Sequence, residues 1–519
     1  MWGGLNIAFV NKFEYIQYSK HGADNMIENH LDVLIVGAGL SGIGAAVHLQ
    51  TECPEKSYAI FEGRNAIGGT WDLFRYPGIR SDSDMHTLGY IFKPWMGNKA
   101  IADGPNIRSY VCETAAEHGI EKHIRFGHKV THASWSSAAG HWTLTVETSE
   151  GDKTYTAGFL MMCSGYYNYD AGYTPDFEGA DTFHGEIVHP QKWTPDINYD
   201  DKSVVVIGSG ATAVTLVPEM AKDAAHVTML QRSPSYVVSR PAKDALANAL
   251  RAILPNKLAY RVTRWKNIVV QQYFYNKTQE QPKKAKDVLL KRLRKNLGDG
   301  FDIETDFTPR YNPWEQRLCL VPDGDLFESL KSGDASVKTG HIDKFVAEGI
   351  KLKSGEVLKA DMIVTATGLD MQMFGGMSLD IDGKARTAND SVTYKGLMFS
   401  DVPNLANVFG YTNASWTLKA DLTCQYVCRV LKHMDECNAD YCVPRLVDDV
   451  ELQEMRPLSS GYFARAVDKL PREGAKLPWK QHHDYFADVK LLREAPVADG
   501  VLQFENKTSS ENLASVAAE

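Results

Sequence analysis

Cysteine is scarce in this sequence, with eight residues among 519. That number is too small for the disulfide framework of a small secreted protein. No two cysteines form a CxxC pair, because the most closely spaced, Cys424 and Cys428, are four positions apart. A zinc knuckle and a CxxC thiol-redox centre are therefore disfavoured, no metal site is predicted, and each cysteine is expected to be a buried structural thiol.

The sequence also lacks an excess of positive charge and a long hydrophobic run. It carries 56 Lys and Arg residues against 65 Asp and Glu residues, a formal net charge of −9, so no overall basic field would attract nucleic acid. No stretch approaches about 18 uninterrupted apolar residues, which disfavours a transmembrane helix. No secretory signal opens the sequence. These absences predict a cytoplasmic protein, with residues 1–29 as an N-terminal extension and 506–519 as a C-terminal tail.

What the sequence does contain is a strand, a glycine turn and a helix in direct succession. Residues 31–36 predict a buried parallel strand and residues 43–50 a helix. The turn between them contains Gly37, Gly39, Ser41 and Gly42. The first glycine permits the sharp turn, the second lets the backbone approach a pyrophosphate, and the third lets helix and strand pack closely, while the serine can add a hydroxyl donor. Glu62, which ends the next predicted strand, can accept hydrogen bonds from an adenosine ribose.

The same pattern returns near residue 203. Residues 203–207 predict a strand that leads into a second glycine turn and a helix. The turn consists of Gly208, Ser209, Gly210, Ala211, Thr212 and Ala213. The next predicted strand, 226–230, is followed by Gln231 and Arg232 rather than by an acid. Because a guanidinium can bind a 2′-phosphate that a carboxylate would repel, this site is predicted to prefer NADPH over NADH.

Two such units in one chain predict two bound dinucleotides, FAD at the first turn and NADPH at the second. The predicted fold class is α/β, with two dinucleotide-binding, Rossmann-like domains and a helical insert in the NADPH domain. Two further predicted strands, 159–163 and 361–365, would each close one of the two sheets. The predicted domains are 30–175 with 385–505 for FAD and 176–384 for NADPH, with the insert at 240–310.

Two longer motifs lie outside the glycine turns. Residues 68–82 read GGTWDLFRYPGIRSD, and residues 183–193 read FHGEIVHPQKW. They resemble the long signature and the Phe-x-Gly-x-x-x-His-x-x-x-Trp fingerprint of the type I Baeyer–Villiger monooxygenases, which are class B flavoprotein monooxygenases. Thr194 departs from the Pro or Asp that usually follows the fingerprint. The segments CSGYYNYD, NPWEQRLCLVP and GYTNASWTLKADL most resemble the ethionamide-activating group of that family.

The resemblance implies roles for further residues. The flavin-cradling loop would comprise Thr70, Trp71, Asp72 and Leu73, and the backbone of Val130 would contact the adenine of FAD. Arg80, Ser81 and Asp82 would lie where flavin and nicotinamide meet, the first two contacting NADPH. Arg317 matches the catalytic arginine, and Asp82 would orient it.

The resemblance also covers two segments with a weaker assignment. The fingerprint residues Phe183, Gly185, His189 and Trp193 would couple domain movement to catalysis, although a single histidine in a linker is as often only packed. Asn413 and Trp416 would border the substrate pocket, although Trp416 is also a candidate core residue.

The implied reaction is an oxygen insertion. NADPH would reduce the flavin, O2 would add to give a C4a-peroxide, and this species would convert a small apolar ketone to an ester or lactone. A guanidinium stabilises the negative charge that develops during such an attack. Sulfides or thioamides could be oxygenated at the same site.

Three alternatives stay open. The nearest is an N- or S-hydroxylating flavin monooxygenase without ester formation. A disulfide reductase would need paired cysteines near the flavin, and the first predicted sheet offers only the separated Cys53, Cys112 and Cys163. A non-catalytic flavoprotein would show no flavin bleaching with NADPH.

One segment of the predicted insert is strongly basic. The cluster comprises Lys283, Lys284, Lys286, Lys291, Arg292, Arg294 and Lys295. Leu290, Leu293 and Leu297 recur at helical spacing beside it. The favoured interpretation is a solvated face whose leucines cap the core, and the alternative is a helix peripheral to the inner face of a membrane.

Overall fold

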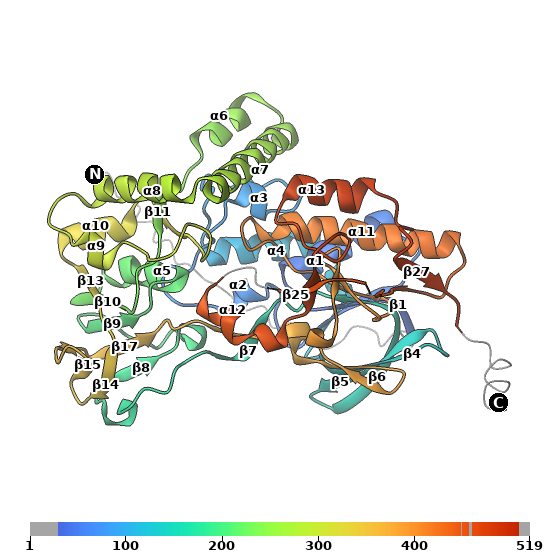
Figure 1. Cartoon of the computed structure of the whole chain (residues 1–519), viewed down its shortest axis with the longest axis horizontal. Helices are drawn as coiled ribbons and strands as arrows, with labels where there is room; N and C mark the ends of the chain where they lie inside the picture. The colour runs from blue at the N-terminus through green and yellow to red at the C-terminus, as the bar shows by residue number, and fades with distance from the viewer. Residues whose placement is uncertain (1–29, 448, 456–458, 508–519) are drawn as a thin grey trace, which may run out of the picture.

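The structure is a computed structural model that describes residues 30–447, 449–455 and 459–507. The predicted N-terminal extension and nearly all of the predicted C-terminal tail lie outside these residues. Figure 1 shows two sheets side by side, each with helices packed against it. This α/β architecture with two sheets confirms the predicted fold class.

The larger sheet has the order β20-β19-β4-β5-β6-β1-β2-β3, with β23 paired to β6. Its strands are β1 (His30–Val36), β2 (Tyr58–Glu62), β3 (Ile124–Phe126), β4 (Lys129–Ser136), β5 (His141–Thr148), β6 (Gly151–Met162), β19 (Ser378–Ile381), β20 (Lys384–Arg386) and β23 (Leu405–Asn407). Strand β1 is buried on both faces, because Val33 and Ile35 enter one core cluster while Leu34 and Val36 enter another.

The smaller sheet is parallel throughout, in the order β13-β10-β9-β17-β8. Its strands are β8 (Glu186–Val188), β9 (Ser203–Ile207), β10 (His226–Gln231), β13 (Ala335–Thr339) and β17 (Met362–Thr365). Strand β17 pairs with β9, as β6 pairs with β1 in the larger sheet. The two later strands therefore join the sheets as predicted, beside β1 and β9, but they do not close them, because β5 continues beyond β6 and β8 beyond β17.

The chain returns to the larger sheet earlier than the predicted boundary at residue 385. Strand β19 pairs in parallel with β4, and Leu379 lies opposite Ala133. The four residues of β19 contain one fully buried side chain, so their sequence shows too little alternation to reveal a strand.

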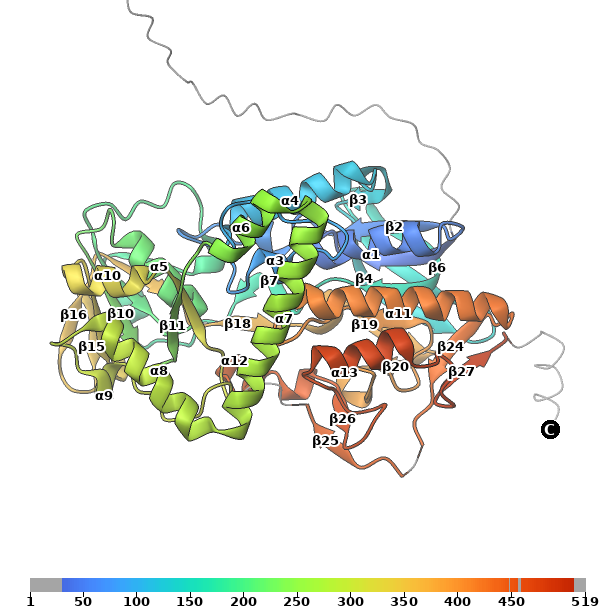
Figure 2. The same ribbon diagram turned by 90° about the horizontal axis from the view of Figure 1, so that it is seen from above.

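The insert is helical, as the sequence predicts. Its helices are α6 (Ala245–Ile253), α7 (Asn256–Glu280), α8 (Pro282–Leu297) and α9 (Ile303–Asp306). The three predicted leucines of α8 are buried, and Leu293 and Leu297 pack in the core of the smaller domain, which confirms that this face of the helix caps the core. Helix α7 instead runs toward the larger sheet and contacts α3 (Figure 2).

The other elements connect or cover the two sheets. The remaining helices are α1 (Leu40–Glu52), α2 (Thr70–Leu73), α3 (Met85–Leu88), α4 (Gly104–Glu117), α5 (Ala211–Met220), α10 (Asp325–Ser332), α11 (Trp416–Glu436), α12 (Gly461–Arg465) and α13 (Tyr485–Val489). The small sheets are formed by β7 (Tyr167–Gly172) with β18 (Leu369–Met371), β11 (Val237–Arg240) with β12 (Cys319–Pro322), β14 (Ile342–Val346) with β15 (Gly349–Leu352) and β16 (Val357–Lys359), β21 (Thr393–Tyr394) with β22 (Met398–Phe399), β24 (Tyr441–Pro444) with β27 (Leu502–Glu505), and β25 (Leu452–Glu454) with β26 (Arg472–Gly474). Within the described residues, no helix is both long and apolar enough to cross a membrane.

Candidate functional site

The first glycine turn joins β1 to α1 and requires glycine at two positions. Gly37 has a φ of +105°, and a Cβ atom there would lie 2.7 Å from the carbonyl oxygen of Cys163 at the end of β6. A Cβ atom on Gly42 would lie 1.9 Å from the carbonyl oxygen of Gly37. Gly39 faces Gly69, so the turn and the predicted flavin loop meet backbone to backbone.

Two side chains hold this turn in place. The carboxylate of Glu62 accepts hydrogen bonds from the backbone N–H groups of Ala38, at 2.8 Å, and Arg64, at 2.9 Å. Burial raises the pKa of Glu62, while those two N–H groups lower it. The hydroxyl of Ser41 accepts a hydrogen bond from the indole Nε1 of Trp416 at 2.8 Å, which leaves its own hydrogen free to donate.

The loop after the turn contains a buried carboxylate, Asp72, from the predicted flavin-cradling segment. It contacts three guanidinium groups, those of Arg64 at 2.5 Å, Arg108 at 2.8 Å and Arg75 at 2.9 Å. These partners could not be predicted from the sequence, because the arginines occur in unrelated local patterns. Asp72 therefore fixes the loop and holds positive charge beside the turn. The other loop residues, Thr70, Trp71 and Leu73, are partly buried in α2, and Val130 is buried in β4.

The second glycine turn joins β9 to α5. Gly208 has a φ of +143°, and a Cβ atom there would lie 2.4 Å from the carbonyl oxygen of Ala366 at the end of β17. A Cβ atom on Gly210 would meet no atom within 4 Å, so the space over this turn is open. Ser209 donates to the carbonyl oxygen of Ser233 at 3.0 Å. Ala211, Thr212 and Ala213 form the first turn of α5.

The two residues after β10 have different environments. Gln231 is buried, and its amide donates to the carbonyl oxygen of Asp306 at 2.6 Å and to the hydroxyl of Thr339 at 2.9 Å. Its side chain is thus bound within its own domain. Arg232 is exposed, which leaves its guanidinium available to a ligand.

A second arginine near this turn was not identified from the sequence. The guanidinium carbon of Arg465, in α12, lies 3.4 Å from the centroid of the Tyr173 ring. Its Nη2 is 3.5 Å from the position that a Cβ atom on Gly368 would occupy. Burial lowers the pKa of Arg465, and the positive charge of Arg232 lowers it further. Only the tertiary fold brings α12 to the end of β17, so the sequence contained no signal for this contact.

The predicted catalytic pair lies between the two turns. Nη1 of Arg317 is 3.9 Å from the carboxylate of Asp82, and the side chains are 38% and 27% exposed. Two residues after Arg317, the thiol of Cys319 donates to the carbonyl oxygen of Ser209 in the second turn, at 3.6 Å. Arg80 donates to the carboxylate of Asp325 in α10. Loop 80–82 therefore joins the flavin loop to the smaller domain, while Ser81 is buried within it.

The electrostatics of this pair keep the arginine charged. Burial would lower the pKa of Arg317, but Tyr166, Tyr462 and Asp82 raise it above its ordinary value. Burial raises the pKa of Asp82, and the charges of Arg317 and Arg80 oppose that rise. Burial also raises the pKa of Tyr167 to about 12, so this phenol stays neutral.

Aromatic rings connect the first turn to the predicted catalytic arginine. Tyr166 stacks on Trp416 with a centroid distance of 5.4 Å and an interplanar angle of 22°. Trp416 in turn contacts the ring of Phe409 and donates a hydrogen bond to the hydroxyl of Ser41. The predicted substrate residue Trp416 is therefore also a neighbour of the first turn. Asn413 donates to the carbonyl oxygen of His483 at 2.8 Å, and its buried Oδ1 has no partner among the described residues.

The fingerprint segment contacts the connection between the domains. Strands β7 and β18 form this connection as an antiparallel pair. The ring of His189 lies against Gly172, where a Cβ atom would be 2.0 Å from its Cε1. Burial lowers the pKa of His189, which keeps it neutral. Phe183 and Trp193 are buried core residues of the smaller domain, and a Cβ atom on Gly185 would lie 2.2 Å from the carbonyl oxygen of Asp361.

The arrangement fits two dinucleotides. Both glycine turns hold their backbone close to the end of a neighbouring strand, with a helix N-terminus facing the space above. The buried hydroxyl of Ser164, beside Gly37, and Nη2 of Arg80 make no hydrogen bond with any described residue. Such orphaned groups are expected where a polar ligand completes the site. All eight cysteines lie within the described residues and are free thiols.

Comparisons with known proteins agree with this geometry. Residues 35–94 match the model for an NAD(P)-binding Rossmann-like domain, and residues 95–292 match the model for flavin-binding monooxygenase-like proteins. The chain is 51% identical over 480 residues to the FAD-containing monooxygenase EthA of Mycobacterium tuberculosis strain H37Rv, covering 92% of this chain and 98% of that protein.

Two solved structures share the fold. An oxidized steroid monooxygenase bound to NADP superposes with a TM-score of 0.68 at 24% identity, over 80% of this chain and 87% of that chain. The OTEMO complex with FAD and NADP gives a TM-score of 0.67 at 22% identity, also over 80% and 87%. With half of its residues shared across nearly the whole length of EthA, the chain belongs to the family of EthA-type FAD-containing monooxygenases.

Proposed function

We propose that this protein is an FAD- and NADPH-dependent Baeyer–Villiger monooxygenase that uses O2 to convert a small apolar ketone into an ester or lactone. The observation that carries the proposal is the position of Arg317, a charged arginine beside Asp82 and two residues from a contact with the second glycine turn. Oxygen insertion next to a carbonyl develops negative charge, and a fixed guanidinium stabilises such charge. The steroid monooxygenase and OTEMO structures share this fold.

The two dinucleotides would occupy the two turns. FAD would lie over Gly37 to Gly42, with its adenosine near Glu62 and its flavin toward the loop at 70–73. NADPH would lie over Gly208 to Ala213, with its 2′-phosphate near the exposed Arg232. When bound, the reduced flavin supplies the activated oxygen.

The residues of this chain would orient the reactants and exclude water. Tyr166, Phe409 and Trp416 form an aromatic cluster between the first turn and Arg317. Apolar side chains there strengthen the field of the guanidinium, because water would otherwise screen it. Asp82 would hold Arg317 toward the oxygen, and its own charge is balanced by Arg80.

His189 would couple domain movement to the reaction. It lies against Gly172 in the strand pair that connects the domains, and burial keeps it neutral. It is therefore assigned a positioning role.

Arg317→Ala tests the proposal. The variant should still be reduced by NADPH under anaerobic conditions, while ester formation from a linear ketone should fall by about 10²–10³-fold. Arg317→Lys is the matched control, because lysine keeps the positive charge but lacks the planar guanidinium group with its paired donors. This variant should retain part of the activity. Flavin bleaching reports reduction, and mass spectrometry reports the product. Unchanged ester yield in Arg317→Ala would remove this residue from the mechanism.

The same assay separates ketone from sulfur oxygenation. The wild-type protein is given a linear ketone and a sulfide with NADPH and O2. Ester from the ketone supports the Baeyer–Villiger assignment. Sulfoxide without any ester would assign the narrower N- or S-hydroxylating activity instead.

A further inference from the structure

Exposed apolar side chains are concentrated on helices α6 and α7. Among the described residues, 17 large hydrophobic side chains are strongly exposed, and nine of them lie between residues 246 and 288. The most exposed are Ile253 at 77%, Trp265 at 64% and Tyr273 at 61%. Both views show the two helices at one side of the molecule, with no other helix or strand of the described residues over them (Figures 1 and 2).

Most of these side chains lie along one face of the helix that carries them. On α6, Leu246, Ala249 and Ile253 are spaced by three and four residues, which places them on one face. On α7, the exposed side chains Leu258, Val262, Trp265 and Tyr273 recur with the same periodicity. We call this set, with Leu246 and Ile253, the α6–α7 surface.

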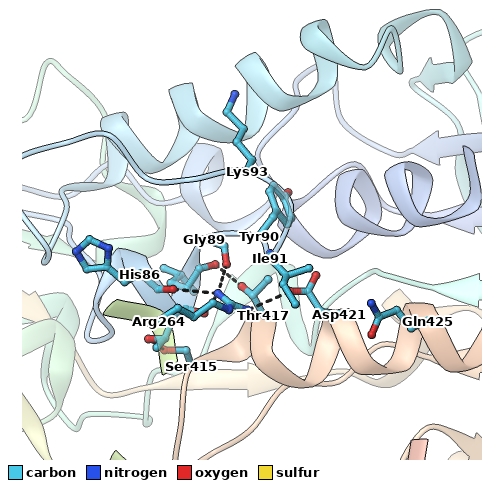
Figure 3. A network of polar contacts seen from close by, with 12 residues as sticks. His86, Gly89, Tyr90, Ile91, Lys93, Arg264, Ser415, Thr417, Asp421 and Gln425 are labelled. Carbon is cyan, nitrogen blue, oxygen red and sulfur yellow. Dashed lines mark hydrogen bonds and ion pairs between the residues drawn. The ribbon is translucent and has the colours of Figure 1, made fainter. Parts of the chain in front are cut away.

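The opposite face of α7 is fixed to the larger domain. Tyr260 donates to the carbonyl oxygen of Tyr90 at 2.9 Å, and Asn267 donates to the carboxylate of Asp84 at 2.8 Å. The buried Arg264 lies on this face as well (Figure 3). The apolar side chains that α7 contributes to the α6–α7 surface therefore point to solvent. The helix could not turn them inward without breaking the hydrogen bonds of Tyr260 and Asn267.

The segment that carries this surface is strongly basic. Residues 241–297 contain 14 Lys and Arg residues and three Asp and Glu residues, a formal charge of +11. Since the whole chain carries −9, the remaining 462 residues carry −20. Lys257 and Arg261 are exposed beside the apolar side chains, and the basic cluster of α8 follows directly.

We propose that the α6–α7 surface docks the protein onto a lipid bilayer with anionic headgroups. Aliphatic side chains with Trp and Tyr beside basic residues form the pattern of an interfacial helix, in which the apolar face enters the headgroup region and the cations attract anionic lipid. The sequence pointed to the leucines of α8 for such a contact. The structure buries those leucines and leaves α8 to supply charge, while α6 and α7 supply the apolar contact.

A second copy of this chain is a poorer occupant. A symmetric dimer through this surface would bring together two segments of charge +11, which repel each other. An asymmetric contact would need another apolar patch. The other eight strongly exposed hydrophobic side chains of the described residues are distributed between Met96 and Phe486 along the chain.

Vesicle flotation of the FAD-loaded full chain tests the proposal. Phosphatidylcholine vesicles are compared with vesicles that also contain phosphatidylglycerol, at low and moderate salt. Binding is expected only with phosphatidylglycerol and should weaken as salt increases. The double variant Ile253→Ser/Trp265→Ser and the charge variant Lys257→Glu/Arg261→Glu should each reduce binding about tenfold or more. Phe126→Ser/Val357→Ser, which changes two exposed apolar residues elsewhere, is the matched control and should bind normally.

Three results would overturn the proposal. They are the absence of any lipid-bound fraction, equal binding by Ile253→Ser/Trp265→Ser and the wild type, and a dimer that the same substitutions abolish. NADPH-dependent flavin bleaching should be unchanged in every variant. A failure of membrane docking would therefore be distinguishable from a failure of the proposed oxygenase function.

Discussion

Two arginines from the smaller domain's half of the sequence reach aspartates of the larger domain, and they do so in opposite ways. Arg264 of α7 and its partner Asp421 of α11 are only 6% and 3% exposed, with Nη2 and Oδ2 at 3.1 Å. Nη1 of Arg264 also donates to the carbonyl oxygens of His86 and Gly89, as Figure 3 shows, and to that of Thr87. Arg317 and Asp82 are 3.9 Å apart and partly exposed, and Arg317 makes no hydrogen bond with another described residue.

The difference separates a structural anchor from a reactive group. A buried guanidinium whose two terminal nitrogens are both bonded to protein groups has little capacity left for a ligand, and its removal leaves buried carbonyls without that donor and a carboxylate without that charge. A guanidinium with one loose partner can turn toward a substrate at little cost. Mutation of Arg264 should therefore change the stability of the protein, whereas mutation of Arg317 should change the rate of the reaction.

Arg264→Ala should give the largest effect on stability. It leaves three buried carbonyl oxygens without the guanidinium donor and removes the buried ion pair of Asp421, so the free energy of unfolding should fall by about 3–5 kcal/mol. Arg261→Ala, one turn earlier on the exposed face of α7, is the matched control and should change it by less than about 0.5 kcal/mol. Urea unfolding of both variants measures the difference. Equal losses would mean that the buried network is not an anchor.

The same anchor should make stability depend on pH. Burial lowers the pKa of His48, but hydrogen bonds to Asp421 and Glu52 raise it more, to about 9 from an ordinary 6.5. A raised folded-state pKa gives stability that is fully present below about pH 6.5 and is lost as the pH rises through about 9. The shift corresponds to about 3 kcal/mol.

Urea unfolding at neutral pH and at about pH 10 checks this expectation. The wild type should lose more stability over that interval than His48→Gln, which keeps a donor for Asp421 but does not titrate. Identical pH dependence in the two proteins would show that His48 is not the titrating group.

Arg232→Ala extends the comparison to a second exposed arginine. Its expected effect is on the KM for NADPH, and it is smaller in free energy than the effects above. Hydrogen bonds to a charged group contribute about 1.5–3 kcal/mol, so the KM for NADPH should increase by about 10- to 100-fold. The KM for NADH, which has no 2′-phosphate, should change little. Steady-state NADPH and NADH oxidation measure both. A parallel increase for the two nucleotides would place the 2′-phosphate elsewhere, for example beside Arg465.

Arg317→Ala should give the smallest effect on stability. Its side chain is partly exposed and its one ion pair is long, so the free energy of unfolding should change by no more than about 0.5 kcal/mol. The large loss of ester formation expected for this variant would then be an effect on chemistry alone. A loss of stability comparable to that of Arg264→Ala would erase the contrast between the two arginines.

The local features of the two dinucleotide sites could be predicted from the sequence. Gly37, Gly42 and Gly208 lie within a few residues of the strand and helix that they join, so their roles follow from short-range sterics. Glu62 was predicted for the same reason. Gln231 shows the limit of this reasoning, because its position in the motif suggested a cofactor contact while its amide is bound by Asp306 and Thr339.

The long-range contacts could not be predicted in this way. Arg261 and Arg264 are three residues apart in one helix, and no local pattern shows which of them is buried. The leucines of α8 and the hydrophobic side chains of α7 also look alike in sequence. Burial depends on the direction in which each helix packs, and that is decided by contacts with segments distant in the chain, such as Asp421.

By itself, the sequence determined the two strand–turn–helix units, the choice of Arg232 over an acid, and the resemblance that singled out Arg317, because each depends on neighbouring residues. Only the tertiary structure decided that Arg317 meets Asp82, that Arg264 is an anchor, and that α6 and α7 present an apolar surface. The physical reason is that burial and charge pairing are properties of the surroundings, which the folded chain assembles from residues far apart.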